Sequence, residues 1–268
     1  MPSKYAQIAG DAVHFLHTGP TSLPGVPPAL ERGALFVFVH GAGRNAGDFR
    51  GTLAALEPEH SAVAIDLPGH GRSTGIDALA SVEAYADVVE RFAAAVLRRS
   101  FVLVGWSMGA QVVLAAASRG LPRLAGLVLI SGAAVWTLDP AMLAAQRDVV
   151  RGRRPQIFDK TLFSPATAFD VMREAWTEQV KTDPRVLYGD LSLAQRFDAR
   201  TILASIHLPA LVVQGADDRL TAPGQAEALA RGLSAARLVV LERAGHFPLL
   251  EQPERTHELL TSFAAGLA

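Results

Sequence analysis

One serine of the chain, Ser107, is framed by two glycines in the run GWSMG at residues 105–109. A serine hydroxyl becomes an effective nucleophile only when a neighbouring base removes its proton. The spacing G-x-S-x-G is typical of a sharp turn from a strand into a helix, which exposes the hydroxyl beside the helix N-terminus. Small residues at both flanking positions suit such a turn, because side chains there would collide with the neighbouring backbone. We therefore predict that Ser107 is a nucleophile.

A base and an acid that could serve this serine follow later apolar runs. His246 stands in a loop after residues 238–241, and two adjacent acids, Asp217 and Asp218, come just after residues 210–214. The chain order is serine, acid, histidine, which is one of the orders known for a catalytic triad. The sequence chemistry alone does not choose between the two aspartates, because adjacent residues point in different directions.

A nucleophilic serine also needs donors for the negative oxygen that develops during attack. The apolar run at residues 35–40 ends in HGAG, residues 40–43, whose small residues leave backbone N–H groups free to approach a ligand. We predict that the amides of Ala42 and Met108 form this oxyanion hole. His40 is expected to pack beneath the loop.

Short apolar runs alternate along the chain with longer segments of helical period, which predicts an α/β fold with a mainly parallel, doubly wound sheet. The expected strands are residues 12–17, 35–40, 62–66, 101–105, 126–131, 210–214 and 238–241. The expected helices are residues 46–56, 82–98, 108–118, 225–232 and 254–265. Ser107, the two adjacent aspartates and His246 then all follow strands, so the serine, one of the acids and the histidine are expected to meet at one edge of the sheet.

The stretch at residues 135–206 interrupts this alternation with short helical patterns and no good strand, and it is too long for an ordinary connection. We predict a helical cap there, inserted into a core domain made of residues 1–134 and 207–268. Substrate choice is expected to depend on this cap. The aromatic residues that we expect to line an apolar pocket are Trp106, Trp136, Phe163, Trp176 and Phe247.

Composition limits the other possibilities. The chain has 268 residues, a formal net charge of −1 and no cysteine. These values give no reason to expect nucleic acid or a membrane as partner, and they exclude a disulfide framework, a thiolate metal site and a cysteine nucleophile. We expect a cytoplasmic protein that needs no metal or other cofactor and acts on a small-molecule acyl substrate. The oligomeric state is not predicted by the sequence.

The chain resembles the α/β-hydrolase fold superfamily over nearly its whole length, and most of all its capped bacterial serine esterases, lactonases and carbon–carbon bond hydrolases. The segments that carry this resemblance are residues 40–43, 66–73, 105–109, 215–218, 245–248 and 251–254. In that family the acid stands three residues after the glycine, which implies Asp218. The resemblance implies cleavage of a carboxylic ester or lactone through an acyl-enzyme.

Three other functions compete with this interpretation. A carbon–carbon bond hydrolase of the same fold is one, although such enzymes often carry asparagine before the serine, where this chain has Trp106. A ligand-binding protein that kept the fold without turnover is the second. The third is a dinucleotide-binding oxidoreductase, because residues 41–46 fit G-x-G-x-x-A after a strand and Asp66 follows twenty residues on.

Overall fold

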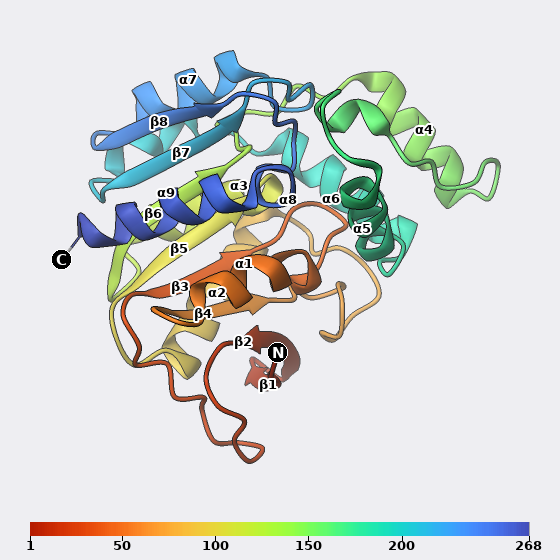
Figure 1. The fold of residues 1–268 in the computed structure, drawn as a ribbon. Helices are drawn as coiled ribbons and strands as arrows, with labels where there is room; N and C mark the ends of the chain where they lie inside the picture. The colour runs from red at the N-terminus through yellow and green to blue at the C-terminus, as the bar shows by residue number, and fades with distance from the viewer. Residues whose placement is uncertain (268) are drawn as a thin grey trace.

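Eight strands form one twisted sheet in the computed structural model, which describes residues 1–267 (Figure 1). Their order across the sheet is β1-β2-β4-β3-β5-β6-β7-β8. The strands are β1 (Ser3–Ile8), β2 (Asp11–His17), β3 (Leu35–Val39), β4 (Ser61–Ile65), β5 (Phe101–Trp106), β6 (Leu124–Ile130), β7 (Ala210–Gly215) and β8 (Ala236–Leu241). β1 pairs with β2, and β2 with β4, in antiparallel fashion, and all other neighbours are parallel. The predicted mainly parallel sheet is confirmed.

The first strand, β1, was not expected from the sequence. It lies at the edge of the sheet and pairs only with β2, and its residues alternate between exposed and partly buried positions. The central strands β3 to β7 are instead buried along almost their whole length. Their continuous apolar runs are the signal of strands covered on both faces, and β1 has no such run.

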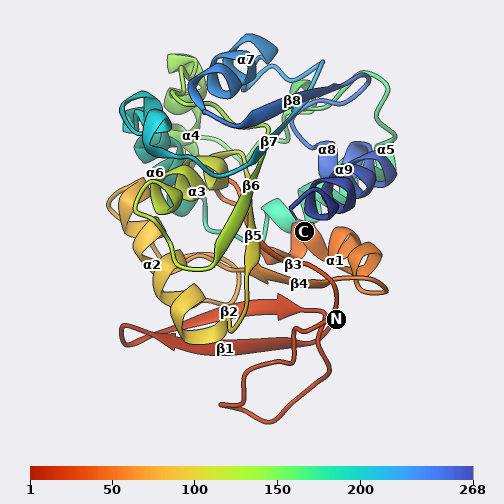
Figure 2. The same cartoon turned by 90° about the vertical axis from the view of Figure 1, so that its left-hand side faces the viewer.

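Helices cover both faces of the sheet, with α2 and α3 on one face and α1 and α9 on the other (Figure 2). The helices of this core are α1 (Arg50–Leu56), α2 (Val82–Val96), α3 (Met108–Ala117), α7 (Pro223–Gly232), α8 (Pro248–Glu251) and α9 (Pro253–Ala265). A short 3-10 turn, Ala46–Phe49, leads into α1. Among residues 1–267, no helix has both the length and the apolarity needed to span a membrane.

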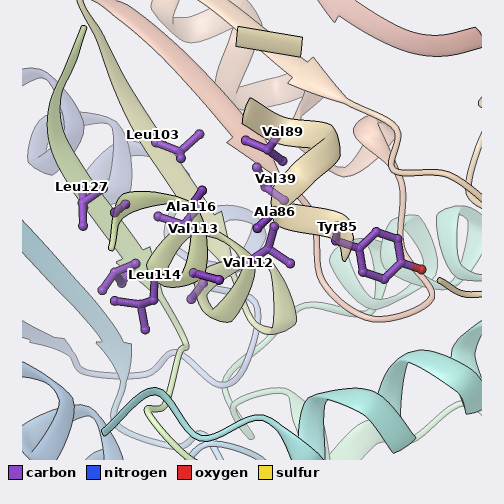
Figure 3. Close-up of a cluster of buried hydrophobic side chains, with 14 of the residues drawn as sticks. Val39, Tyr85, Ala86, Val89, Leu103, Val112, Val113, Leu114, Ala116 and Leu127 are labelled. Carbon is purple, nitrogen blue, oxygen red and sulfur yellow. The ribbon is translucent and has the colours of Figure 1, made fainter. Parts of the chain in front are cut away.

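Helix α3 is the centre of the larger core, because every one of its residues is buried. Val112, Val113 and Ala116 pack between the sheet and α2, whose Ala86 and Val89 face them (Figure 3). Such complete burial fixes the position of the helix, and with it the turn between β5 and α3 that carries Ser107.

The segment from residue 135 to residue 206 contains helices and no strand of the sheet, within the part of the chain that the structure describes. Its helices are α4 (Pro140–Val150), α5 (Phe169–Gln179) and α6 (Pro184–Arg196), joined by short 3-10 turns. They lie together beyond one end of the sheet, on the right of Figure 1. Ser107 follows β5, and side chains of this segment line the same cavity as Ser107, so the segment covers the carboxyl ends of the parallel strands. Below, "cap segment" denotes residues 135–206.

Candidate active site

The turn that carries Ser107 has the geometry expected from its glycines. Ser107 has φ of 60° and ψ of −124°, a backbone conformation that side-chain-bearing residues rarely adopt. A Cβ on Gly105 would lie 2.4 Å from the carbonyl oxygen of Gly109, and one on Gly109 would lie 2.2 Å from the carbonyl oxygen of Val39. Both glycines are therefore required by close backbone approach. The Ser107 amide donates to Ile130 O over 2.8 Å, which fixes the turn against β6.

His246 bridges the serine and an aspartate. The Ser107 hydroxyl donates to Nε2 of His246 over 2.8 Å, and the Nδ1–H of the same ring donates to Oδ2 of Asp218 over 2.9 Å. All three residues are buried, with exposed fractions of 3–4%. Because a carboxylate faces Nδ1, the neutral ring carries its proton there and presents a free electron pair at Nε2. The imidazole is thus oriented to accept the hydroxyl proton.

The Asp218 carboxylate is surrounded by donors besides His246. Oδ1 accepts from the amides of Leu220 (2.8 Å) and Thr221 (3.0 Å), and Oδ2 accepts from the Thr221 hydroxyl (2.7 Å) and the Gln214 amide (2.9 Å). Burial by itself would raise the pKa of Asp218, but the charge of His246 and these hydrogen bonds outweigh it and lower the pKa below its ordinary value. Asp218 therefore stays ionised. Thr221 and Gln214 were not predicted as part of the site.

Asp217 points elsewhere. Its carboxylate accepts from the Ser164 hydroxyl over 2.6 Å, and its amide donates to Ala244 O over 2.9 Å. The residue therefore connects the cap segment to the loop after β7. Only Asp218, of the two adjacent acids, is brought to the histidine ring.

The loop that carries His246 is held from two sides. The Trp106 indole donates to the carbonyl oxygen of His246 over 2.8 Å, and the His246 amide donates to Leu162 O of the cap segment over 2.7 Å. Trp106 adjoins the serine in sequence, so one side chain connects the nucleophile turn to the histidine loop. The position of the ring is thus fixed by groups from both the core and the cap segment.

Glu251 adds a second support that the sequence did not indicate. Its Oε1 accepts from the amides of Gly245 (2.9 Å) and Phe247 (3.0 Å), the two neighbours of the histidine. Its Oε2 accepts from the amide of Ser164 (2.8 Å) and the hydroxyl of Thr167 (2.5 Å), both in the cap segment. One carboxylate therefore holds the histidine loop and the cap segment together.

The predicted oxyanion donors lie beside the serine. A Cβ on Gly41 would stand 2.9 Å from Cβ of Ser107, which shows how closely the loop at residues 40–43 approaches it. Among the hydrogen bonds of residues 1–267, neither the Ala42 amide nor the Met108 amide has a protein partner. Both donors are therefore available to an oxygen at this site.

A buried carboxylate of the cap segment, Asp190 of α6, holds the same loop. It accepts from the Gly43 amide over 2.9 Å, from the Tyr85 hydroxyl over 2.8 Å and from Nε2 of His70 over 2.7 Å. Nδ1 of His70 faces the carbonyl oxygen of Pro68 at 3.0 Å, so both ring nitrogens have acceptors. Burial lowers the pKa of His70, but the charge and hydrogen bond of Asp190 outweigh it and raise the pKa above its ordinary value.

His40 completes the base of the loop, as expected. Its Nδ1–H donates to Gly41 O over 2.9 Å, and its Nε2 accepts from the Leu67 amide over 3.0 Å. Burial, with the nearby charge of His70, lowers the pKa of His40 to about 3. His40 is therefore a neutral structural residue.

The buried pair of His70 and Asp190 predicts a pH-dependent stability. A raised pKa means that proton binding stabilises the fold fully below the unfolded pKa of about 6.5, and that this contribution is lost as the pH rises through the folded value. We expect wild-type Tm to exceed that of the double variant His70→Gln/Asp190→Asn by several degrees at pH 5.5, and the gap to narrow towards pH 9. Thermal unfolding across this range measures it; a gap that stays constant would contradict the assignment.

A cavity of about 550 Å³ opens beside the serine between core and cap segment. Three of the five aromatic residues expected in a pocket, Trp106, Trp136 and Phe247, line this cavity together with Ser107 and His246. The other two do not line the cavity, because each packs against a ring that does. These are Phe163, stacked on Phe247 at 4.4 Å between ring centroids, and Trp176, edge-on to Phe158 at 5.5 Å.

The geometry argues against the dinucleotide interpretation. Asp66, which would have to hold a ribose, is buried and accepts from the Ala46 amide (2.6 Å) and the Arg72 amide (2.9 Å), while its Oδ2 lies 2.7 Å from Nδ1 of His14. At 3% exposure the carboxylate is enclosed by protein groups and is not open to a ribose. The glycines of residues 41–43 serve the approach to Ser107 and α6 instead. Within residues 1–267, no three His, Asp or Glu side chains are grouped as metal ligands would be.

Comparison with known proteins identifies a family and relatives of the chain. The sequence profile of the family described as "Alpha/beta hydrolase family" matches residues 36–259. A pimeloyl-(acyl-carrier protein) methyl ester esterase of Neisseria meningitidis serogroup A is 31% identical over 242 residues, which cover 85% of this chain and 76% of that protein. Its namesake from Yersinia pseudotuberculosis is 28% identical over 242 residues, covering 85% and 92%.

Solved structures show the same architecture. A thermophilic esterase from Thermogutta terrifontis superposes with a TM-score of 0.83 and 25% identity, covering 100% of this chain and 99% of its own. The enol-lactonase of Burkholderia xenovorans LB400 superposes with a TM-score of 0.81 over 97% and 99%, but at 22% identity this likeness is one of fold alone.

Proposed function

The chain belongs to the alpha/beta hydrolase family, and from that premise we propose that it is a serine esterase that cleaves carboxylic esters through an acyl-enzyme. Ser107 is the nucleophile, His246 the general base and acid, and Asp218 the residue that orients the ring. The observation that carries the proposal is the buried chain of hydrogen bonds from Ser107 Oγ to His246 Nε2 (2.8 Å) and from His246 Nδ1 to Asp218 Oδ2 (2.9 Å).

The first half of the proposed reaction forms the acyl-enzyme. His246 Nε2 takes the hydroxyl proton as Ser107 Oγ attacks the ester carbonyl, and the amides of Ala42 and Met108 donate to the oxygen that becomes negative. The ionised Asp218 stabilises the imidazolium that results. His246 then gives its proton to the leaving alcohol oxygen as the carbon–oxygen bond breaks.

The second half releases the acid. A water molecule loses a proton to His246 Nε2 and attacks the acyl carbonyl, with the oxyanion held by the same two amides. Collapse of this intermediate returns the proton to Ser107 Oγ and frees the carboxylic acid. The cap segment limits access of bulk water to these steps, since its residues form one side of the cavity.

The cavity and the relatives support a proposal for the substrate class. The cavity has the size of an ordinary small-ligand site, and apolar residues form much of its wall; six of them are Met142, Val149, Ile157, Phe158, Leu187 and Leu191. The relatives from Neisseria and Yersinia are named pimeloyl-(acyl-carrier protein) methyl ester esterases. We propose that the substrate is an ester of an aliphatic acyl chain with a small alcohol. A lactone contains the same bond, with the acyl group and the alcohol joined in one ring.

A fluorophosphonate probe tests the proposed reaction class. Folded wild-type protein should gain one phosphonyl group, located at Ser107 by peptide mass spectrometry, because the probe needs an activated serine. p-Nitrophenyl esters from acetate to decanoate should be hydrolysed with a burst of about one p-nitrophenol per enzyme where deacylation is slow. A folded protein that neither labels nor hydrolyses any of the esters would mark a binding protein instead.

A further inference from the structure

Arg44 places a buried guanidinium in the wall of the cavity that holds Ser107. The residue is 4% exposed and directly follows the loop at residues 40–43. Its Nε donates to Asp48 Oδ2 over 3.0 Å, and its Nη2 donates to Oδ1 of the same carboxylate. The charge of the guanidinium is therefore already balanced inside the protein.

The far edge of this guanidinium has no hydrogen-bond partner. Nε–H and the adjoining Nη2–H occupy one edge of the planar group, so Nη1 lies on the edge that faces away from Asp48. Among residues 1–267, no acceptor pairs with Nη1, which is itself buried. A buried donor without a partner lowers stability, which makes it exceptional in a folded protein.

The surroundings of the guanidinium place it close to the reacting groups. Its central carbon lies 5.6 Å from the ring centroid of Trp106 and 5.3 Å from that of Phe247. These rings adjoin Ser107 and His246 in the chain, and all five residues line the same cavity. The ring faces attract the positive charge but offer Nη1 no oxygen or nitrogen acceptor.

A second residue that lines the cavity also has a buried donor without an acceptor. The indole Nε1 of Trp136 is buried and has no acceptor within residues 1–267. Within the described part of the chain, the cavity wall thus contains two unpartnered buried donors, Arg44 Nη1 and Trp136 Nε1, whereas none of the unpartnered buried acceptors there belongs to a lining residue. A ligand that suits this wall supplies oxygen acceptors.

We propose that Arg44 Nη1 donates a hydrogen bond to a second carbonyl oxygen of the substrate, so that the preferred substrates are oxo-substituted esters. The inference rests on the proposed esterase function and specifies its substrate class. A neutral carbonyl is preferred to a carboxylate because Asp48 already balances the guanidinium, and a second buried carboxylate would share one cation.

Matched esters that differ by one CH₂-to-C=O replacement test this preference. The pairs are p-nitrophenyl pentanoate with 4-oxopentanoate, p-nitrophenyl hexanoate with 5-oxohexanoate, and propyl hexanoate with 2-oxopropyl hexanoate, which places the oxygen on the alcohol. The quantity measured is the ratio of kcat/KM within each pair. Comparing this ratio between wild type and variants cancels the intrinsic reactivity of the esters.

Two variants remove the donor in different ways. Arg44→Lys keeps a positive charge for Asp48 without the second donor edge, and Arg44→Met/Asp48→Asn removes both charges so that no carboxylate is left unpaired. We expect the oxo preference of at least one pair to fall by roughly tenfold or more in both variants, because a hydrogen bond from a charged donor is lost. Trp136→Phe should reduce the same ratio less. Arg154→Met, at a partly exposed arginine of the same cavity, should keep it.

Each alternative outcome has a distinct meaning. Plain esters hydrolysed with an oxo preference that is the same in wild type and Arg44 variants would overturn this inference and leave the esterase proposal standing. An Arg44-dependent gain for mono-p-nitrophenyl hexanedioate, with none for the oxo esters, would overturn it in favour of a carboxylate. Failure of the folded wild type to hydrolyse any ester would overturn both.

Discussion

Replacing Ser107 by alanine is expected to lower kcat for p-nitrophenyl esters by at least about 10⁴-fold, because the attacking oxygen and the acyl-enzyme are both lost. The fold should survive, since alanine keeps Cβ and the residue's own amide still donates to Ile130 O. Loss of a hydroxyl from the positive-φ turn adds no strain. Steady-state hydrolysis, together with circular dichroism of the variant, measures both parts of the result.

Ser131 provides a matched control for this variant. It directly follows β6, is fully buried, has φ of 47°, and its hydroxyl has no partner among residues 1–267. Ser131→Ala therefore removes a hydroxyl from a similar backbone without touching the proposed reaction, and kcat should stay within about twofold of wild type. Comparable activity of Ser107→Ala and Ser131→Ala would contradict the nucleophile assignment.

The second large effect is expected from Asp218→Asn. An asparagine amide facing Nδ1 favours the ring tautomer with its proton on Nε2, which cannot accept the serine proton, so kcat should fall by roughly 10³- to 10⁴-fold. Asp217→Asn should change kcat by no more than about threefold, because Asp217 contacts Ser164 and not the ring. Measuring kcat of both variants side by side shows which of the two adjacent aspartates orients the histidine.

Stability has to be measured beside the kinetics. Asp218 accepts hydrogen bonds from Leu220, Thr221 and Gln214 in addition to His246, so its replacement also weakens the loop after β7. Assays well below the Tm of each variant isolate the catalytic effect. A larger loss in Asp217→Asn than in Asp218→Asn would refute the assignment.

The fold was predictable where buried elements leave an apolar pattern in the sequence. Seven of the eight strands were anticipated within a few residues, because each contains a short apolar run. β3 to β7 are almost wholly buried, and the edge strand β8 is apolar at residues 238–241 although it is only partly buried. β1 was not predicted, because polar residues such as Lys4 and Gln7 interrupt it and leave no apolar run. The short helix α8, which Gln252 alone separates from α9, was likewise not predicted, and only α9 was expected.

Within the site, the features that could be predicted were those whose parts lie close together in the sequence. The nucleophile turn was readable because its glycines, strand and helix adjoin Ser107 in the chain. Glu251 and Asp190 were not readable as supports, because the partners of Glu251 in the cap segment and the Gly43 partner of Asp190 lie 84 to 147 residues away, and these contacts exist only after folding. The pocket was predicted in part for the same reason: aromatic side chains in the cap segment indicate apolar packing, but sequence does not tell which ring faces the cavity.

Glu251 has a mechanical consequence. Any hinge motion that carries Ser164 and Thr167 outward to admit or release a ligand must break both hydrogen bonds at Oε2. The freed carboxylate would then hold the backbone on either side of His246 less rigidly, through Oε1 alone. Opening the entrance and misaligning the base are therefore one event, so the imidazole is best positioned when the entrance is shut.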